Sequence, residues 1–317
     1  MSNSKIIIFG GDDDNYHENK KIFIFDNNYK TWSKLDIDYI SGNCKCLTLN
    51  KNTILLVLEH SSNIIIFDIN KKLFFDKYHP IFQKYQATIH NKNNNDTIFD
   101  RLCIRYSESS VLLNNGKLLI IGGQQREFTF SHEPSKIIVH KNYEIYTPSS
   151  LSYDVEKYNG KWKIGYMNKQ RIASACVLLK NNLVLIIGGE NESSCEYFNP
   201  ESETFSDAGS TLEPRYNHTA TVLLNGDVLV TGGFNDGKCL KSCEIFSNNE
   251  WKYVADMNIN RTEHSAALLE DGNVLICSGC DVLFPITSCE IYNPILNKWS
   301  FTSDIPLGLF GHSSTTN

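Results

Sequence analysis

The sequence predicts an all-β propeller built from six repeated units. One segment recurs in which an arginine is followed by an apolar run, a tight polar turn, a second apolar run and a glycine pair. Since each unit holds four strand signals and spans about 40 to 50 residues, the repeat is typical of propellers rather than of helical solenoids. The arginine lies seventeen positions before the first residue of the pair at Arg105/Gly122, Arg171/Gly188, Arg215/Gly232 and Arg261/Ser278.

The first two strands of each unit, called a and b, are predicted to form a hairpin. Two apolar runs are joined through Asn115-Gly116, Asn225-Gly226 and Asp271-Gly272. Because these dipeptides tolerate positive φ at both central positions, we expect a tight turn between twisted strands. The glycine pair ends strand b, where we expect a side chain to collide with a neighbouring blade or with the central axis.

Strands c and d follow each glycine pair. Strand c is a short β-rich string that ends in an aromatic residue, and strand d brings a bulky aromatic a few residues later that is expected to pack between blades. The strand c strings are 23–25, 65–67, 156–158, 196–198, 244–246 and 290–292. In the third unit a competing alignment makes 143–148 strand c, but the spacing to Trp162 favours 153–158.

These glycine pairs, followed by a Tyr and a Trp at fixed spacing, resemble the kelch repeat over nearly the whole chain. The resemblance implies a four-stranded blade for each unit and a central channel. The second unit departs from the pattern, since Leu58-Glu59 replaces its glycine pair. The expected blades of this single domain are 1–40 plus 308–317, 41–77, 101–165, 166–210, 211–256 and 257–307, with insertions at 78–100 and 124–152.

The two ends of the sequence are predicted to close the ring together. The chain begins at a strand b, residues 5–9, and ends with residues 311–316, which look like a strand a. A C-terminal strand that completes the first blade leaves no open edge, which would otherwise be an aggregation site. No room remains for a BTB or F-box domain, so we expect a stand-alone kelch-type propeller.

Composition favours a soluble cytoplasmic protein that uses no metal or cofactor. The net charge of -6 and the lack of a basic stripe argue against nucleic acid and acidic membranes as partners. No apolar run is long enough for a signal peptide or a membrane span. Most of the ten cysteines follow the repeats, which indicates buried strand residues in a reducing compartment. Cys277 and Cys280 have a metal-ligand spacing, but a zinc site needs four ligands.

The long insertions predict which face binds a ligand. Strand direction alternates within a blade, so the b–c and d–a connections emerge on one side, and both insertions use that side. Loops of such length are functional or disordered. We expect 124–152 to be an ordered lobe whose candidate partner-binding residues are Phe128, Phe130, His132 and Tyr143.

The four arginines are candidate ligand-binding residues. Arg105, Arg171, Arg215 and Arg261 each begin a strand a and would gather at the channel mouth, where guanidinium groups suit a carboxylate, a phosphate or an acidic peptide. The alternative is that each arginine pairs with an acidic residue or a carbonyl of its own repeat. His218, His264 and His312 share one repeat position, and we interpret them as repeat-consensus residues rather than as a metal or acid–base set.

Two functions are compatible with these features. The favoured one is a non-catalytic interaction module that binds a protein or peptide segment, with an acidic partner if the arginines take part. The other is an enzyme of the sugar mutarotase type, in which the arginines bind an acidic sugar and Glu108 acts as acid or base. A copper radical oxidase fits badly, because the histidines are repeat residues and the further domain of that site is missing. Since no catalytic constellation is visible, we favour binding.

Overall fold

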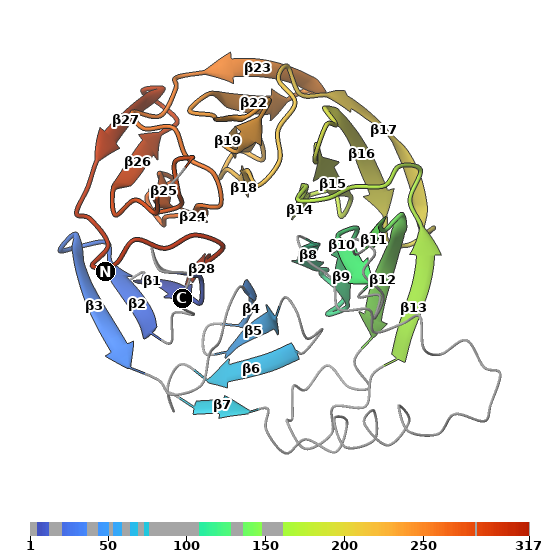
Figure 1. The fold of residues 1–317 in the computed structure, drawn as a ribbon, viewed down its shortest axis with the longest axis horizontal. Helices are drawn as coiled ribbons and strands as arrows, with labels where there is room; N and C mark the ends of the chain where they lie inside the picture. The colour runs from blue at the N-terminus through green and yellow to red at the C-terminus, as the bar shows by residue number, and fades with distance from the viewer. Residues whose placement is uncertain are drawn as a thin grey trace.

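Six four-stranded sheets form the structure, a computed structural model that describes residues 5–12, 21–36, 44–50, 53–58, 64–68, 73–75, 108–127, 136–147, 161–282 and 284–316. Figure 1 shows the sheets around a central axis, with strand a of each sheet innermost and strand d on the rim. The predicted all-β propeller with six blades is therefore confirmed.

In each blade the strands follow one another outward from the axis in the order a to d. Blade one holds β28 (Ser313–Thr316), β1 (Lys5–Phe9), β2 (Lys21–Asp26) and β3 (Thr31–Asp36). Blade two holds β4 (Cys44–Asn50), β5 (Thr53–Leu58), β6 (Ile64–Asp68) and β7 (Leu73–Phe75). Blade three holds β8 (Ser109–Leu112), β9 (Leu118–Ile121), β12 (Asn142–Thr147) and β13 (Lys161–Tyr166).

The second half of the ring follows the same plan. Blade four holds β14 (Ala175–Leu178), β15 (Val184–Ile187), β16 (Ser194–Asn199) and β17 (Thr204–Ser210). Blade five holds β18 (Thr219–Val222), β19 (Val228–Thr231), β22 (Cys243–Ser247) and β23 (Glu250–Val254). Blade six holds β24 (Ser265–Leu268), β25 (Val274–Cys277), β26 (Cys289–Asn293) and β27 (Lys298–Phe301). Two extra hairpins are β10 (Gln124–Glu127) with β11 (Lys136–Val139) and β20 (Phe234–Asn235) with β21 (Lys238–Cys239).

The C-terminal strand closes the first blade, as predicted. β28 pairs antiparallel with β1, from Ile6 opposite Thr316 to Phe9 opposite Ser313. Each innermost strand also contacts its two neighbours, so that β28, β4, β8, β14, β18 and β24 form an unbroken ring. The first blade thus joins the two ends of the chain and completes the ring.

The hydrophobic core lies between blades. Every residue of β9, β15, β19 and β25 is buried, because each strand b is covered on both faces. One cluster joins Leu119 and Ile145 of blade three to Val184 and Phe198 of blade four. Trp299 of β27 packs against blade five, and its indole N–H donates to the carbonyl of Ala255 at 2.8 Å. The expected interblade position of the strand d aromatic is confirmed at Trp299.

The a–b turns differ from the expected two-residue type. The N–H of Gly226 donates to the carbonyl of Leu223 at 2.9 Å, so Leu224 and Asn225 are the central residues and only Gly226 has positive φ. This is a type I turn closed by a left-handed residue, a common three-residue hairpin loop. Asn225 is favoured for another reason, since its Oδ1 accepts from the N–H of Asp227 at 3.0 Å. The prediction of positive φ at both positions is wrong.

The glycine pairs lie where a side chain would collide with backbone. A Cβ on Gly122 would lie 2.3 Å from the carbonyl oxygen of Arg171 in the next blade. A Cβ on the second glycine, Gly233, would lie 2.7 Å from the carbonyl oxygen of Tyr216 in its own blade. Both glycines also have positive φ. The expected collision with a neighbouring blade is confirmed at Gly122, whereas a side chain at Gly233 would collide with its own blade.

Strand c of the third blade is β12, so the preferred alignment at 153–158 is wrong. β12 pairs with β9 through Tyr143 opposite Ile121, and Glu144 takes the position of the strand c glutamate in later blades. The spacing to Trp162 placed strand c too late in the sequence, because the c–d connection of this blade is longer than in the others. Residues 153–158 and the insertion 78–100 lie outside the described residues.

Candidate interaction face

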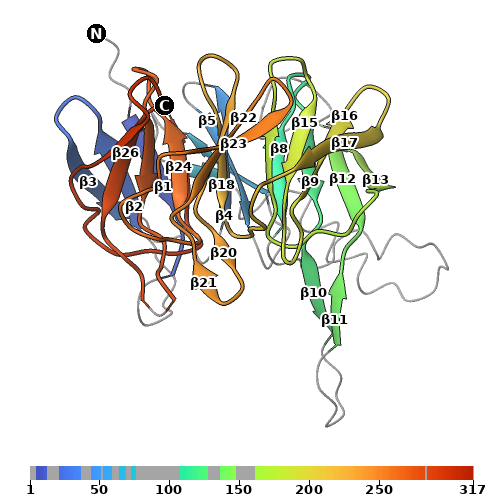
Figure 2. The same ribbon diagram turned by 90° about the horizontal axis from the view of Figure 1, so that it is seen from above.

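The b–c face is the side of the propeller that carries the b–c and d–a connections. Both extra hairpins lie in b–c connections, β10–β11 in blade three and β20–β21 in blade five. Figure 2 shows the two hairpins projecting from the same side of the ring. Two independent insertions therefore enlarge one face.

The β20–β21 hairpin is anchored at its base and exposed at its tip. A β-bridge and a ring contact of 5.5 Å join Phe234 to Tyr216, which belongs to the connection that enters the blade. Asp236 and Gly237 form the exposed tip, with φ of 46° and 75°. The Asn235-Asp236-Gly237 run is a turn signal that could have predicted this hairpin from the sequence. A fixed base with an exposed tip suits a recognition loop.

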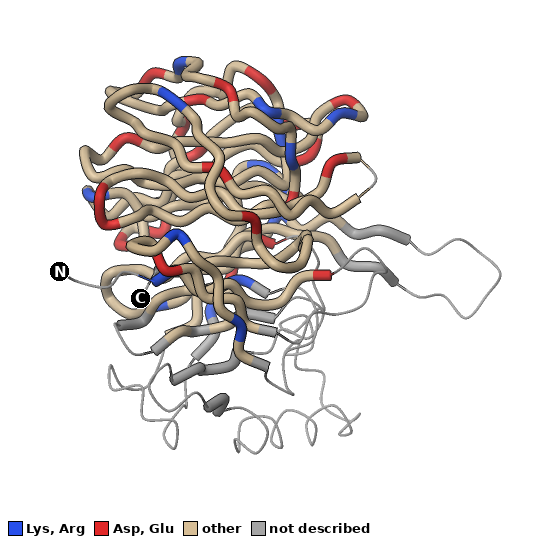
Figure 3. The backbone as a smooth tube through the Cα atoms, turned by 90° about the vertical axis from the view of Figure 1, so that its left-hand side faces the viewer, with Lys and Arg blue, Asp and Glu red and all other residues tan. Residues whose placement is uncertain are grey.

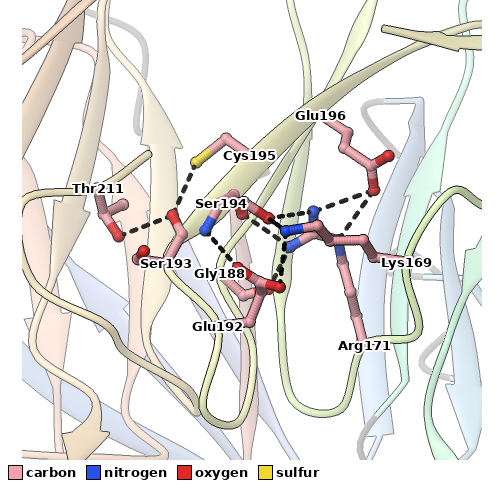
Figure 4. A network of polar contacts seen from close by, with 9 residues as sticks. All are labelled: Lys169, Arg171, Gly188, Glu192, Ser193, Ser194, Cys195, Glu196 and Thr211. Atoms are coloured by element: carbon pink, nitrogen blue, oxygen red, sulfur yellow. Dashed lines mark hydrogen bonds and ion pairs between the residues drawn. The ribbon is translucent and has the colours of Figure 1, made fainter. Parts of the chain in front are cut away.

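Arg171 lies inside the protein and is fully engaged by its own blade (Figure 4). Its Nη1 donates to the carbonyl oxygens of Gly188 and Ser194, both at 2.7 Å. Its Nε and Nη2 donate to Oε2 of Glu196 at 3.2 and 3.0 Å. The hydrogen bond from Arg171 to the carbonyl oxygen of Gly188 joins residues seventeen positions apart, and it therefore explains the repeated offset.

The same contacts recur in blades five and six. Arg215 and Arg261 have no exposed surface, and each Nη2 pairs with the buried strand c glutamate, Glu244 at 2.7 Å and Glu290 at 2.8 Å. Each Nη1 again donates to the carbonyl seventeen positions ahead, that of Gly232 or Ser278. Of the two roles considered for the arginines, pairing within the own repeat matches this geometry.

The strand c glutamates also hold the d–a connections. Glu244 accepts from the backbone N–H groups of Leu212 at 2.7 Å and Glu213 at 3.2 Å. Glu290 accepts from Asn258 at 2.8 Å and Ile259 at 3.2 Å. One buried ion pair therefore fixes a b–c and a d–a connection of the same blade. Removing one partner from such a pair costs about 3 to 5 kcal/mol, because it leaves a buried charge uncompensated.

Of the remaining predicted site residues, only Tyr143 lies within the described residues. Arg105, Phe128, Phe130 and His132 lie outside the described residues. Tyr143 lies in β12 and not in a loop, and it is buried between the rings of Phe198 and Phe205 of blade four. Burial and the carboxylate of Glu203, to which its hydroxyl donates at 3.3 Å, raise the pKa of Tyr143 to about 12. A ligand role for the arginines stays a prediction, and it requires guanidinium groups that a carboxylate can reach.

The channel is lined by the six strands a around a cavity of about 190 Å³. His218, His264 and His312 line it from three adjacent blades, and all three are buried. Burial and the charge of Arg215 lower the pKa of His218 to about 3, so its imidazole is neutral. Nε2 of His264 lies 3.0 Å from Oγ1 of Thr219 and of Thr231 in the preceding blade. This contact supports the repeat role, and no metal-binding group of three His, Cys, Asp or Glu occurs among the described residues.

The connections of the b–c face carry more carboxylates than lysines in blades four to six, although half of these carboxylates are partly buried. The described connections carry the carboxylates Glu190, Glu192, Glu213, Asp236, Asp256, Glu263, Asp281 and Asp304 but only the lysines Lys169, Lys238 and Lys241. Two of these lysines pair with carboxylates of the same face, Lys169 with Glu192 and Lys241 with Asp256. Figure 3 shows the charges of both signs dispersed along the described backbone, without a basic stripe.

Comparison with known proteins identifies the repeat. The Kelch motif family model matches residues 214–258, a segment that contains Arg215, the glycine pair, Glu244 and Trp251. Kelch-like protein 41a of Danio rerio is 33% identical over 121 residues, which is 36% of this chain and 20% of that protein. Kelch-like protein 7 of Rattus norvegicus is 36% identical over 73 residues, or 22% of this chain and 12% of that protein.

The matches therefore cover a fifth or less of the length of these relatives. In the described residues no helix has the length and apolarity needed to cross a membrane. The six four-stranded blades, the repeated arginine, glycine pair and glutamate, and the matched motif agree with one another. The chain therefore carries a Kelch motif within a six-bladed β-propeller.

Proposed function

We propose that this protein is a non-catalytic interaction module that binds a protein or peptide segment on its b–c face. Kelch repeats on a propeller support an interaction module in general. The observation that carries the choice of face is the framework of buried Arg–Glu pairs, which fix the connections from which the β20–β21 hairpin projects. A rigid platform reduces the conformational entropy lost when a partner binds.

The partner we propose carries lysine or arginine residues. The acidic partner predicted from the arginines needs exposed guanidinium groups, whereas those of Arg171, Arg215 and Arg261 are buried and ion-paired. The described connections of this face in blades four to six carry eight carboxylates, four of them exposed, and three lysines. Complementary charge raises the association rate and selects partners.

Exposed apolar residues give the partner an anchor on the same face. Val282 and Phe284, in the b–c connection of blade six, are 59% and 64% exposed, and Leu212 lies in the d–a connection before blade five. Aromatic side chains of this kind carry a large share of binding energy at interfaces. The free cysteines of the described residues support a reducing compartment, and we place the protein in the cytoplasm on that ground.

The test compares two apolar substitutions in blade six. Phe284→Ala changes the b–c face, and Leu296→Ala changes an equally exposed residue in the β26–β27 turn on the opposite face. Partners captured from a lysate by the intact chain should be lost with Phe284→Ala and kept with Leu296→Ala. Basic peptides should compete for capture better than acidic peptides of matched length. Equal loss with both variants, or competition by the acidic peptides, would contradict the proposal.

A further inference from the structure

Cys277 and Cys289 lie directly opposite each other in blade six, at the ends of β25 and β26. The next pair outward along the ladder is hydrogen-bonded, since the N–H of Ser278 donates to the carbonyl of Ser288 at 3.2 Å. Hydrogen-bonded and non-hydrogen-bonded pairs alternate in an antiparallel ladder, so the two cysteines form a non-hydrogen-bonded pair. Such pairs have Cα atoms about 4.5 Å apart and side chains on one face, a separation that a disulfide can span.

Among the described blades that share this register, only blade six places two thiols there. The equivalent pairs are Ile121 with Tyr143, Ile187 with Cys195 and Thr231 with Cys243. Cys195 and Cys243 therefore have the burial and backbone of Cys289 without a thiol opposite them. They are internal controls for any chemistry that needs a pair.

The surroundings shift the pKa values of the two thiols in opposite directions. A hydrogen bond from Cys277 lowers the pKa of Cys289, and the backbone N–H of Ile305 and the charge of Arg261 lower it further, although burial acts against them. Burial raises the pKa of Cys277 well above its ordinary value. Burial likewise raises the pKa of Cys243 to about 12. The thiolate, which is the nucleophile, thus forms more readily at Cys289.

Both cysteines lie in the apolar cluster between blade six and blade one, the blade that the C-terminal strand closes. This cluster contains Ile8, Phe23 and Leu309, and both cysteines are at most 1% exposed. An oxidant must therefore be small and uncharged to reach the sulfur atoms of the folded protein. Hydrogen peroxide meets this condition, whereas a peptide disulfide does not.

We propose that Cys277 and Cys289 form a dithiol that hydrogen peroxide converts into a disulfide between β25 and β26. The Cys289 thiol gives up its proton, and the thiolate attacks one peroxide oxygen. The O–O bond breaks, the departing hydroxide takes up that proton as water, and a sulfenic acid remains on Cys289. Cys277 then attacks this sulfur, the S–O bond breaks and a second water leaves with the Cys277 proton. Two thiols are oxidised while one peroxide is reduced.

The test is peptide mapping of the full chain after peroxide treatment. Remaining thiols are alkylated under denaturing conditions, and the digest is analysed by mass spectrometry. We expect a cross-linked peptide that contains Cys277 and Cys289 and lacks two hydrogen atoms. Cys243 should appear in no cross-link. The proposal fails if both cysteines are still alkylated after the more exposed Cys280 has been fully oxidised, or if either one is linked to a different cysteine.

Single substitutions separate the two roles. In Cys277→Ser the cross-linked peptide should be lost and Cys289 should accumulate as a sulfenic or sulfinic acid, because no resolving thiol remains. In Cys289→Ser, Cys277 should stay reduced. Equal peroxide reactivity of the remaining cysteine in the two variants would overturn the assignment of Cys289 as nucleophile. Thr231→Cys recreates the pair in blade five and should gain a cross-link with Cys243, which keeps the test decisive if a serine variant fails to fold.

Discussion

The contact between adjacent blades is built differently in blades four to six and in blade one, the closing blade that the C-terminal strand completes. In the regular blades the second glycine donates its N–H to the carbonyl of the arginine that opens the next blade, as from Gly233 to Arg261 at 2.9 Å. At the closure Gly279 donates to Leu309 at 2.8 Å, so the backbone bond is kept without the guanidinium. The glutamate is replaced as well, since Phe23 faces Ile8 as Glu290 faces Ile276.

Leu309 and Phe23 are buried in one apolar cluster. The closure therefore exchanges a buried ion pair for two apolar side chains. A buried pair often contributes no more to stability than well-packed apolar residues, whereas half of a pair is costly. The difference teaches that the backbone bond defines the ring and that the Arg–Glu pair can be replaced if both members change together.

The largest expected effect comes from breaking one pair in a regular blade. Arg215→Leu leaves Glu244 charged and buried, so the free energy of unfolding should fall by about 3 to 5 kcal/mol. Adding Glu244→Phe, which copies the closure, should recover more than half of this loss. Recovery stays incomplete because the N–H of Leu212 loses its acceptor. Urea denaturation followed by circular dichroism measures both variants.

The control for this comparison is the exposed ion pair of the same blade. Glu250 and Lys252 lie 3.0 Å apart with both side chains about two-thirds exposed, so Glu250→Ala should change stability by less than about 1 kcal/mol. A double variant no more stable than Arg215→Leu would show that the pair and the apolar contact are not interchangeable.

A glycine substitution should act equally in the two regions. A Cβ would lie 2.7 Å from the Tyr216 carbonyl oxygen at Gly233 and 2.5 Å from that of Thr262 at Gly279. Gly233→Ala and Gly279→Ala should each cost about 2 to 4 kcal/mol, from the collision and the left-handed backbone. Gly237→Ala isolates the backbone cost, because no atom lies within 4 Å of its Cβ, and it should cost about 1 kcal/mol. A clear difference between Gly233→Ala and Gly279→Ala in chemical denaturation would mean that the hydrogen bond from Gly279 to Leu309 is not equivalent to the one from Gly233 to Arg261.

The repeat allowed the ring of blades to be predicted from the sequence. It did not allow the role of the arginine or strand c of blade three to be predicted. The constant offset from Arg215 to Gly232 predicted the unit because one hydrogen bond enforces it. The role of the arginine could not be decided, since its distance to the glutamate varies, from 25 residues for Arg171 to 29 for Arg215. Sequence spacing also failed in blade three, because the connection between β12 and β13 is longer than in the other blades and the alignment depended on the distance to Trp162.

Stability should fall in acid through histidines of both regions. Burial and the charge of Arg215 lower the pKa of His218 to about 3, and burial with the charges of Lys45 and Arg261 lowers that of His312 to about 3. Each folded pKa lies below the unfolded value of about 6.5, so the contribution is complete above pH 6.5 and is lost as the pH falls toward 3. Each histidine should contribute about 1.4 kcal/mol per pH unit within that window.

His218→Phe and His312→Phe test this pH dependence one region at a time. Each variant should lower the slope of unfolding free energy against pH by the same amount between pH 6 and pH 4. Urea denaturation at several pH values gives the slopes. Unchanged slopes would mean that these imidazoles are already charged in the folded protein.

The smallest expected effect comes from supplying a missing hydrogen bond. His264 has hydroxyl partners in Thr219 and Thr231, whereas the equivalent positions in blade four are Ala175 and Ile187. His218 therefore lacks the hydroxyl partners of His264 at these two described positions. Ala175→Thr should therefore raise the free energy of unfolding by about 1 kcal/mol. The gain should vanish in His218→Phe, because the new hydroxyl then has no imidazole to meet. Ala175→Thr could instead stabilise the original protein and His218→Phe equally. That result would mean that the threonine acts through strand packing and that its contact with the histidine does not contribute to stability.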